Sequence, residues 1–340
     1  MLALVKTERG EGHLELIARP TPEPAPGWVR IAVIYAGICG TDLHIVHDRF
    51  PYWPPVTLGH EFVGRVDAVG GLVDPAWIGT RVVSEPHSLA CGTCQLCRRG
   101  IAELCASKRS PGWGIDGAFS ASLTMPVHLI HRVPDGVPDI VAALTEPMAI
   151  AVTALLRARV DPGDTVLVVG AGPVGILAAV AARTMGAGRV LVTGRPGSDR
   201  LAFAATLGFG VADGATIGEA IGAATDGRGA DLVIDASGTA DGIALAFEAV
   251  KRRGRMAAIG LSGVPDLDIP WDVAVSRAID LTFSMSSSSS AWEPAIGILA
   301  GTGIALEPMV TVFPLADWSA AFDAVAARTV IKALLDPVGP

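Results

Sequence analysis

The sequence predicts an α/β protein of two domains, one built from antiparallel β-structure and one from a parallel sheet with helices on both faces. Its 340 residues, half of them hydrophobic, exceed what one compact core usually holds. Short alternating segments broken by Pro and Gly fill the first part, and strands alternating with Ala-rich helices begin near Ile150. We expect the first domain at 1–148, completed by 289–340, and the second at 149–288.

The predicted strands of the first domain are segments in which apolar and polar residues alternate. They lie at 28–37, 64–70, 80–85 and 122–133. Such alternation is typical of antiparallel sheets that bury one face and leave the other in water.

The second domain alternates apolar strands with helices, which is the pattern of βαβ units. The predicted strands lie at 164–170, 189–194, 231–238, 254–260 and 280–286, and the predicted helices at 174–187, 200–208 and 244–252. The serine run at 286–290 is expected to be a connecting turn. Helices at 292–299 and 318–326 and a closing strand at 331–337 are expected to return to the first domain.

Charge and hydropathy exclude several classes of partner. A net charge of −8 gives no general attraction to nucleic acid or to anionic lipid. The uncharged stretch Thr165–Ala182 is nearly long enough to span a membrane, but its glycines and Pro173 favour a strand, a turn and a helix. The first residues lack the long apolar core of a secretory segment. We therefore expect a cytoplasmic protein without a nucleic-acid or membrane partner.

Four of the five cysteines lie within 15 residues, in the spacing Cys-x2-Cys-x2-Cys-x7-Cys. Disulfides, a CxxC redox pair and a metal site all use such cysteines, and an iron–sulfur site is a further alternative. A redox CxxC normally opens a helix of a βαβ unit, whereas this cluster lies between β-segments. Four thiolates complete the tetrahedral shell of Zn²⁺ and leave no position for a substrate. The favoured interpretation is a structural zinc site at Cys91, Cys94, Cys97 and Cys105.

The fifth cysteine, Cys39, belongs to a second group of metal-ligating residue types. His60 and Glu61 follow it by 21 and 22 residues, and Glu146 lies among apolar residues. A lone buried Cys is usually core packing and a lone His-Glu pair usually surface. A carboxylate among apolar residues is costly to bury unless something such as a metal ion compensates its charge.

Five spaced motifs give the chain a specific family resemblance. They are GICGTDLH (37–44), GHEFVGRVDAVG (59–70), the cysteine cluster (91–105), EPMA (146–149) and GAGPVG (170–175). In this order and over nearly the whole length, they resemble the zinc-dependent medium-chain dehydrogenases/reductases, in particular the polyol (sorbitol-like) dehydrogenase branch. The resemblance implies a GroES-like catalytic domain, a Rossmann domain and homodimers or homotetramers.

The resemblance also implies a catalytic zinc. It places zinc ligands at Cys39 and His60, with Glu61 and Glu146 as acidic ligands or alternates with water. Such a zinc acts as a Lewis acid on the hydroxyl of the substrate. Thr41 and His44 match the proton-relay positions of the family, and histidine titrates near neutral pH. The alternative for His44 is an ordinary loop histidine.

The fifth motif, GAGPVG, has the sequence context of a dinucleotide-binding loop. Gly170, Gly172 and Gly175 follow a predicted strand and open a predicted helix, together with Pro173 and Val174. The glycines allow a tight turn, approach of the pyrophosphate and close helix packing, and the helix N-terminus faces the phosphates.

The end of the next strand bears on the choice of cofactor. NAD-binding folds carry an acid there, whereas this chain has Gly194 followed by Arg195. Arg195 and Arg200 could clamp a 2′-phosphate, which predicts NADP in preference to NAD. Asp199 leaves NAD open as the alternative, because its carboxylate could reach the ribose.

We therefore expect two Zn²⁺ per chain and an NAD(P)-dependent enzyme that interconverts a secondary alcohol and a ketone. Polyols, cyclitols and diols are the expected substrates, and an L-threonine-type amino alcohol is an alternative. The pocket is expected around 50–53, Trp113 and the region near Ser286. From other classes, a catalytically inactive zinc-stabilised nucleotide-binding protein and a thiol redox protein are the competing hypotheses.

Overall fold

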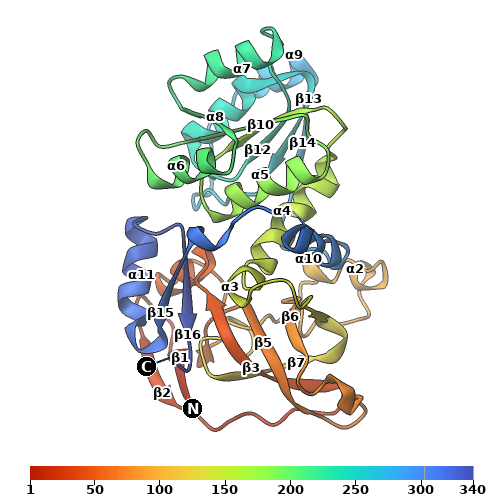
Figure 1. The fold of residues 1–340 in the computed structure, drawn as a ribbon, viewed down its shortest axis with the longest axis vertical. Helices are drawn as coiled ribbons and strands as arrows, with labels where there is room; N and C mark the ends of the chain where they lie inside the picture. Colours follow the sequence, from red (N-terminus) through yellow and green to blue (C-terminus); the bar gives the residue numbers. More distant parts are fainter. Residues whose placement is uncertain (302, 340) are drawn as a thin grey trace. The chain divides into compact units, whose positions relative to one another are not determined.

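The computed structural model describes residues 1–301 and 303–339 (Figure 1). Its internal contacts divide the chain into two compact units. Unit 1 comprises Met1–Glu146, Leu299–Gly301 and Leu306–Pro340, and unit 2 comprises Pro147–Ile298 and Thr302–Ala305. The chain from Leu306 onward belongs to the unit formed by the N-terminal segment, whereas most of the predicted helix 292–299, which was expected to return there as well, belongs to unit 2.

Unit 1 is built on two β-sheets. The larger is seven-stranded, with the order β15-β16-β3-β5-β6-β8 and with β7 paired to β3; the smaller has the order β2-β1-β4. Their strands are β1 Leu2–Lys6, β2 Leu14–Ala18, β3 Trp28–Gly37, β4 Val56–Thr57, β5 Glu61–Val69, β6 Arg81–Ser84, β7 Ser122–Pro126, β8 Ile130–Arg132, β15 Val310–Pro314 and β16 Lys332–Asp336. All pairs are antiparallel except β15 with β16.

The alternating pattern of β3 shows why this sheet forms. Val29, Ile31 and Val33 are buried, whereas the residues between them are only partly covered. Their side chains join the core of unit 1, which also takes in Phe119 and Leu335. Burial of a Val or Ile side chain contributes about 1.5–3 kcal/mol, so this register fixes which face of β3 points inward.

Unit 2 contains a six-stranded parallel sheet with the order β11-β10-β9-β12-β13-β14. Its strands are β9 Thr165–Val169, β10 Arg189–Gly194, β11 Gly210–Asp213, β12 Ala230–Asp235, β13 Val250–Ala258 and β14 Asp280–Phe283. Counted along the chain this order is 3-2-1-4-5-6, the order of the Rossmann fold. Ligands of such sheets bind beyond the carboxyl ends of the strands, where β9 and β12 lie side by side.

Helices cover both faces of this sheet. Figure 1 shows α5 and α6 on one side of the strands and α7, α8 and α9 on the other. The bounds of these helices are α5 Pro173–Thr184, α6 Asp199–Thr206, α7 Ile217–Thr225, α8 Ala240–Ala249 and α9 Trp271–Arg277. Strand β9 is buried along its whole length, as expected for a central parallel strand.

The remaining α-helices of the described residues lie in the connections between strands. They are α1 Gly40–Val46, α2 Gln95–Arg98, α3 Asp139–Ala142, α4 Thr145–Ala158, α10 Trp292–Gly301 and α11 Trp318–Ala327. Helices α10 and α11 confirm the two helices predicted near the end of the chain. Of the helices in residues 1–301 and 303–339, none combines the length and apolar character needed to cross a bilayer.

The structure corrects the sequence prediction at one helix and adds several elements, three of them within the parallel-sheet domain. The predicted helix 244–252 ends at Ala249, because Val250 enters β13 and pairs with Ala230 of β12. The strand then bends at Arg253, whose φ is +54°, before pairing resumes at Arg255. Strand β11 and helices α7 and α9 were not predicted, since glycine and short polar stretches interrupt their patterns.

Candidate metal and nucleotide sites

Three metal-ligating side chains meet at one end of the large sheet of unit 1. Cys39 is the N-cap of α1, and His60 and Glu61 lie where β5 begins. Gly37 of β3 pairs with Glu61, which brings Cys39 back beside the start of β5. The candidate ligand atoms of Cys39, His60 and Glu61 all lie within 4.8 Å of one another. The sequence motifs at 37–44 and 59–70 thus converge in space.

Negative charge accumulates around this group. Glu146 lies in the first turn of α4 and is buried, and burial together with repulsion from Glu61 raises its pKa to about 7. Burial by itself would lower the pKa of His60, but Asp42, Cys39 and Glu146 raise it to about 10. The cluster therefore stabilises positive charge at His60, and a divalent cation would receive the same stabilisation.

A buried lysine compensates part of this charge. Lys332, the first residue of β16, pairs with the Glu61 carboxylate, and both side chains are 2% exposed. Its Nζ also donates to the carbonyl of Ile38 at 2.9 Å. Burial would lower the pKa of Lys332, but Glu61 and Cys39 raise it. Gly37 makes this pair fit, because a Cβ there would lie 2.3 Å from Glu61 Oε2.

A second buried carboxylate faces the histidine. Asp42 Oδ2 accepts a hydrogen bond from the backbone N–H of Cys39 at 2.8 Å, and Oδ1 lies 3.8 Å from His60 Nδ1. Neither Asp42 Oδ1 nor His60 Nδ1 has a hydrogen-bond partner. Burial raises the pKa of Asp42, which the His60 ring opposes. With Nδ1 beside the carboxylate, Nε2 is the nitrogen that can turn toward a ligand.

Thr41 and His44 lie on α1, three residues apart and therefore on one side of the helix. The Cys39 thiol donates to Thr41 Oγ1 at 3.7 Å, which places the hydroxyl beside the candidate ligand. His44 lies in the last turn and is half-buried. Both side chains are therefore placed by the helix that Cys39 begins.

This donor set fits zinc. One thiol, one imidazole and carboxylates are the ligand types of catalytic zinc sites, which keep one position for water or substrate. The carboxylates buried around Cys39 and His60 need a cation for compensation beyond Lys332. Cys39, His60 and Glu61 or Glu146 could hold such an ion.

The four clustered cysteines also converge. Their sulfur atoms all lie within 4.8 Å of one another, and all five cysteines of the chain are free thiols. Backbone N–H groups donate to the sulfurs, from Cys94 to Cys91 at 3.3 Å and from Cys97 to Cys94 at 3.4 Å. Four sulfurs in this arrangement could enclose one tetrahedral ion, with no position left for a substrate.

The N–H···S bonds also favour thiolates. They lower the pKa of Cys91 to about 6 and lower that of Cys105. Burial, together with hydrogen bonding to the neighbouring cysteine sulfurs, raises the pKa of Cys97 to about 12. A bound cation would stabilise the thiolate of Cys97 as well, so the cluster is suited to a metal ion.

The glycine loop of unit 2 has the geometry that the motif predicts. Gly170 follows β9 with a φ of +107°, and a Cβ there would lie 2.9 Å from the nitrogen of Ser237. Gly172 is the N-cap of α5, with nothing within 4 Å of an added Cβ. A Cβ on Gly175 would lie 1.9 Å from the carbonyl oxygen of Gly170. Pro173 and Val174 form the first turn of α5. The space beside Gly172 lies at a helix N-terminus, where a pyrophosphate is stabilised.

The neighbouring strand β10 ends at Gly194, and a Cβ there would lie 3.1 Å from Ala171 Cβ. Arg195 is exposed directly beyond it, and Arg200 lies in the first turn of α6. Asp199, also exposed, is the first residue of α6. Arg195 is thus placed at the carboxyl end of the strand next to β9.

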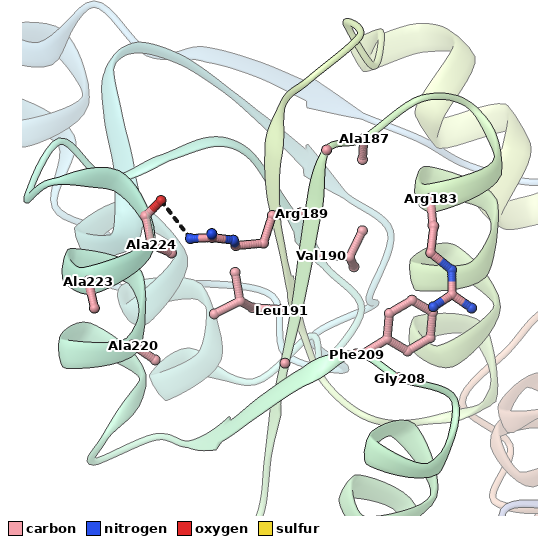
Figure 2. Close-up of a pocket in the computed structure, with 12 residues that line it drawn as sticks. Arg183, Ala187, Arg189, Val190, Leu191, Gly208, Phe209, Ala220, Ala223 and Ala224 are labelled. Carbon is pink, nitrogen blue, oxygen red and sulfur yellow. Dashed lines mark hydrogen bonds between the residues drawn. The ribbon is translucent and has the colours of Figure 1, made fainter.

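A cavity of about 470 Å³ in unit 2 lies elsewhere (Figure 2). Its walls include Arg189 and Gly210, the first residues of β10 and β11, so it lies at the amino ends of the strands. Arg183 donates to the carbonyl of Leu207 at 2.9 Å and Arg189 to that of Ala224 at 3.0 Å. These arginines thus donate hydrogen bonds to backbone carbonyls near the C-terminal ends of α6 and α7. The cavity is separate from the glycine loop, because Gly170, Gly172 and Gly175 do not line it.

The aromatic residues expected around the pocket lie together in unit 1. Phe50 and Trp113 pack edge to face with ring centroids 5.6 Å apart, and Trp53 stacks on Trp113 at 6.0 Å. The backbone N–H of Trp53 donates to the carbonyl of Trp113 at 2.8 Å. Ser286 belongs to unit 2.

Sequence reasoning missed Asp42 and Lys332. Asp42 follows Cys39 by three residues, the position from which a carboxylate can reach back to an N-cap N–H. Lys332 directly precedes three buried apolar residues in the closing strand, where a charged side chain indicates a buried partner.

The comparisons with known proteins agree with this geometry. Residues 25–135 match the family described as "Alcohol dehydrogenase GroES-like domain", and residues 173–301 match "Zinc-binding dehydrogenase". The chain is 34% identical to a sorbitol dehydrogenase of Halalkalibacterium halodurans over 99% of its length and 100% of that protein. It is 35% identical to an L-threonine 3-dehydrogenase of Saccharopolyspora erythraea over 99% of each.

A solved structure is similar over the same extent. A zinc-binding dehydrogenase from Sinorhizobium meliloti 1021, bound to NADP, matches with a TM-score of 0.89 and 27% identity over 99% of each chain. The family-model matches and these relatives, together with the fold of the two units, establish the family. The chain belongs to the zinc-dependent medium-chain dehydrogenases of the alcohol dehydrogenase superfamily, which are NAD(P)-dependent oxidoreductases of alcohols and polyols.

Proposed function

We propose that this enzyme interconverts a secondary hydroxyl of a polyol and the corresponding ketone, with Cys39, His60 and a glutamate holding the catalytic zinc. The single observation that carries the proposal is the convergence of Cys39, His60 and Glu61 within 4.8 Å in unit 1. A zinc ion bound there would supply Lewis acidity that eases loss of the hydroxyl proton.

Glu146 is the proposed resting carboxylate ligand, and Glu61 the alternate. Lys332 already pairs with Glu61, whereas burial and repulsion from Glu61 raise the pKa of Glu146 to about 7. The carboxylate without a cation gains most from a metal ion. Asp42 acts as a positioning residue that orients the His60 ring.

Thr41 and His44 are proposed to move the substrate proton to solvent. The Thr41 hydroxyl lies beside Cys39, so it can accept a proton from a hydroxyl held at the metal ligands. His44 lies one helical turn further along α1 and is half-buried, so it can pass the proton outward.

The glycine loop is proposed to bind the pyrophosphate of NADP, whose nicotinamide accepts or supplies the hydride. Gly170, Gly172 and Gly175 are the contact positions, with Pro173 and Val174 at the helix N-terminus. The preference for NADP rests on Gly194 in place of an acid and on Arg195 and Arg200 as partners of the 2′-phosphate. NAD is the alternative cofactor.

We also propose a structural zinc at Cys91, Cys94, Cys97 and Cys105, which gives two zinc ions per chain. The proposed catalytic domain spans 1–148 with 289–340, and the proposed nucleotide-binding domain spans 149–288. A homodimer or homotetramer is the proposed assembly.

A polyol is favoured over an amino alcohol as the substrate. The sorbitol dehydrogenase relative agrees with this choice.

Metal analysis and a substrate screen test the proposal. Purified protein is expected to hold two zinc ions per chain and to oxidise secondary polyols with NADP more efficiently than with NAD. L-threonine, cyclitols and vicinal diols belong in the same screen. One zinc per chain and no turnover would instead support an inactive, zinc-stabilised nucleotide-binding protein. A threonine preference would overturn the polyol assignment.

A further inference from the structure

Unit 1 carries an arginine that stacks on an aromatic ring and that no carboxylate of the described residues pairs with. The Arg109 guanidinium stacks over the indole of Trp53, with Cζ 3.6 Å from the ring centroid. Trp53 in turn stacks on Trp113 with an interplanar angle of 30°. Stacking fixes the plane of a guanidinium and directs its N–H groups outward, around the edge of that plane.

The hydrogen bonds of Arg109 leave most of this edge available. Nη1 donates to the backbone carbonyls of Ser107 at 3.3 Å and of Lys108 at 3.0 Å. Within residues 1–301 and 303–339, no carboxylate pairs with Arg109. Other arginines of this acidic chain do pair with aspartates, among them Arg19, Arg30, Arg81 and Arg255. Nη2 and Nε of Arg109 can therefore receive an anion from outside the chain.

The stack adjoins the candidate metal ligands within unit 1. A Cβ on Gly112 would lie 2.9 Å from the nitrogen of Gly59, and Gly59 directly precedes His60. The loop that carries Arg109 and Trp113 therefore packs against the segment that carries a proposed zinc ligand.

Lys108 provides a second link between the stack and the metal ligands. Burial lowers its pKa, and the negative charges of Glu103 and Glu146 oppose that shift. Lys108 therefore interacts electrostatically with the Glu146 carboxylate. Its Nζ also lies over the Trp113 ring, 5.7 Å from the ring centroid.

Building on the proposed function, we infer that Arg109 selects polyols that end in an anionic group, a phosphate or a carboxylate. The reacting carbon would lie at Cys39 and His60, the C–H groups of the polyol against Trp113 and Trp53, and the terminal anion on Arg109. A planar guanidinium pairs with phosphate or carboxylate through two parallel hydrogen bonds, and such charge-assisted bonds are the strong ones. Arg109 is thus a specificity-determining residue.

Steady-state kinetics with three substrates of one carbon chain test the inference. They are a pentitol, its terminal phosphate and the corresponding pentonate. The wild-type enzyme is expected to favour at least one anionic form by about tenfold or more in kcat/KM. Arg109→Gln should lower kcat/KM for that form by about 10- to 100-fold, chiefly through KM, and change the neutral pentitol by less than about twofold. The phosphate and carboxylate arms identify which anion is preferred.

Two further variants separate charge recognition from folding. Arg109→Lys keeps the positive charge but loses the planar guanidinium that makes two parallel hydrogen bonds. It should therefore recover only part of the preference for the anionic substrate over the neutral pentitol. Arg132 is a matched control, because its guanidinium also stacks on an indole of unit 1, 4.3 Å from the Trp77 ring. Arg132→Gln should leave all three substrates unaffected. An equal loss of neutral and anionic substrates in Arg109→Gln, or a wild-type preference for the neutral pentitol, would overturn the inference.

Calorimetry gives a reading that does not depend on turnover. The pentitol phosphate is titrated into zinc-containing wild-type protein and into Arg109→Gln, with the neutral pentitol as the reference. Binding that weakens about tenfold or more in the variant supports the role of Arg109. Equal binding by both proteins overturns it. If neither neutral nor anionic polyols are turned over, the proposed function fails, and the calorimetric comparison still decides the role of Arg109.

Discussion

At the scale of single residues, the candidate metal ligands of unit 1 lie among buried charges that must balance. Glu61, Glu146 and Asp42 are all buried beside Cys39, and Lys332 is the buried cation that faces them. Buried charges are tolerated only when partners or metal ions compensate them. Substitution of either Lys332 or Asp42 should therefore affect metal binding as well as stability.

Lys332→Met should destabilise the protein and tighten its hold on zinc. It leaves the Glu61 carboxylate buried without its cation, which costs about 3–5 kcal/mol. In zinc-loaded protein, Glu61 would then turn to the metal and occupy the position that substrate needs, so turnover should fall. Urea denaturation and chelator titration measure the two effects. Lys251→Met is the control, because the Lys251–Asp231 pair is partly exposed and should contribute less than about 1 kcal/mol. Unchanged zinc retention would contradict the role given to Lys332.

Asp42→Asn should weaken the catalytic zinc site without unfolding unit 1. The amide oxygen can still accept the N–H of Cys39, so the start of α1 is retained. The charge opposite His60 is lost, and removal of such partners typically lowers metal affinity about 10- to 100-fold. Competition with a chromophoric chelator measures the change. Asp74→Asn, at an exposed cap, should bind zinc like the wild type. A variant that keeps wild-type zinc affinity would show that Asp42 does not orient His60.

At the scale of elements, the β9–α5 turn assigns different tasks to glycines of one motif. A Cβ on Gly175 would meet the carbonyl of Gly170 at 1.9 Å, whereas a Cβ on Gly172 would meet nothing within 4 Å. Gly172 also has an ordinary φ of −73°. The protein alone therefore requires glycine at 175, and at 172 only a ligand would.

Gly172→Ala and Gly175→Ala should consequently have different effects: the first should weaken NADPH binding, and the second should lower the stability of unit 2. Gly175→Ala forces α5 away from the turn and should destabilise unit 2 by about 1–3 kcal/mol. Gly172→Ala should keep or slightly raise the Tm, because its backbone conformation suits alanine, while NADPH binding weakens about tenfold or more. Thermal melts and NADPH fluorescence titrations distinguish them. Wild-type NADPH affinity in folded Gly172→Ala would place the pyrophosphate elsewhere.

The cysteine segment should depend on its metal rather than on its own packing. It contains only the four-residue helix α2 and a short 3-10 turn, Ala102–Leu104, and Leu104 is exposed. Cys97→Ser should therefore remove one zinc per chain and lower the Tm, because the metal supplies the folding energy of such a segment. Metal analysis and calorimetry provide the measurement. A variant with the wild-type Tm that loses only turnover would contradict a structural site.

The sequence predicts elements best where local pattern and burial agree. The alternation in 28–37 and the apolar run at 164–170 became β3 and β9, because each pattern matches its sheet. The helix predicted over 244–252 failed beyond Ala249, because pairing of Val250 with Ala230 is a long-range contact. The role of Lys332 could not be predicted for the same reason, because its partner Glu61 lies 271 residues away in the sequence. The family resemblance of the motifs, in contrast, pointed to Cys39, His60 and Glu61, and the structure brings the candidate ligand atoms of these three residues within 4.8 Å of one another.

At the scale of the whole molecule, the proposed metal ligands and the nucleotide loop belong to different compact units. Cys39, His60 and Glu146 lie in unit 1, and the loop from Gly170 to Gly175 lies in unit 2, with its own core around Leu167 and Val233. Each unit has a core that does not depend on the ligand residues of the other. Loss of the catalytic metal should therefore leave the nucleotide loop folded.

Cys39→Ser and His60→Ala should accordingly abolish turnover while NADPH binding survives. Removal of a zinc ligand removes a Lewis-acid contribution of several kcal/mol, so activity should fall to less than about a hundredth of wild type. NADPH should still bind within about threefold of the wild-type Kd, since Gly172 and the start of α5 are unaltered. Fluorescence titration measures binding, and hydrogen exchange of β9 amides with and without NADPH measures protection in unit 2. Residual activity above a hundredth would contradict the ligand assignment, and loss of NADPH protection would show that the two units fold as one.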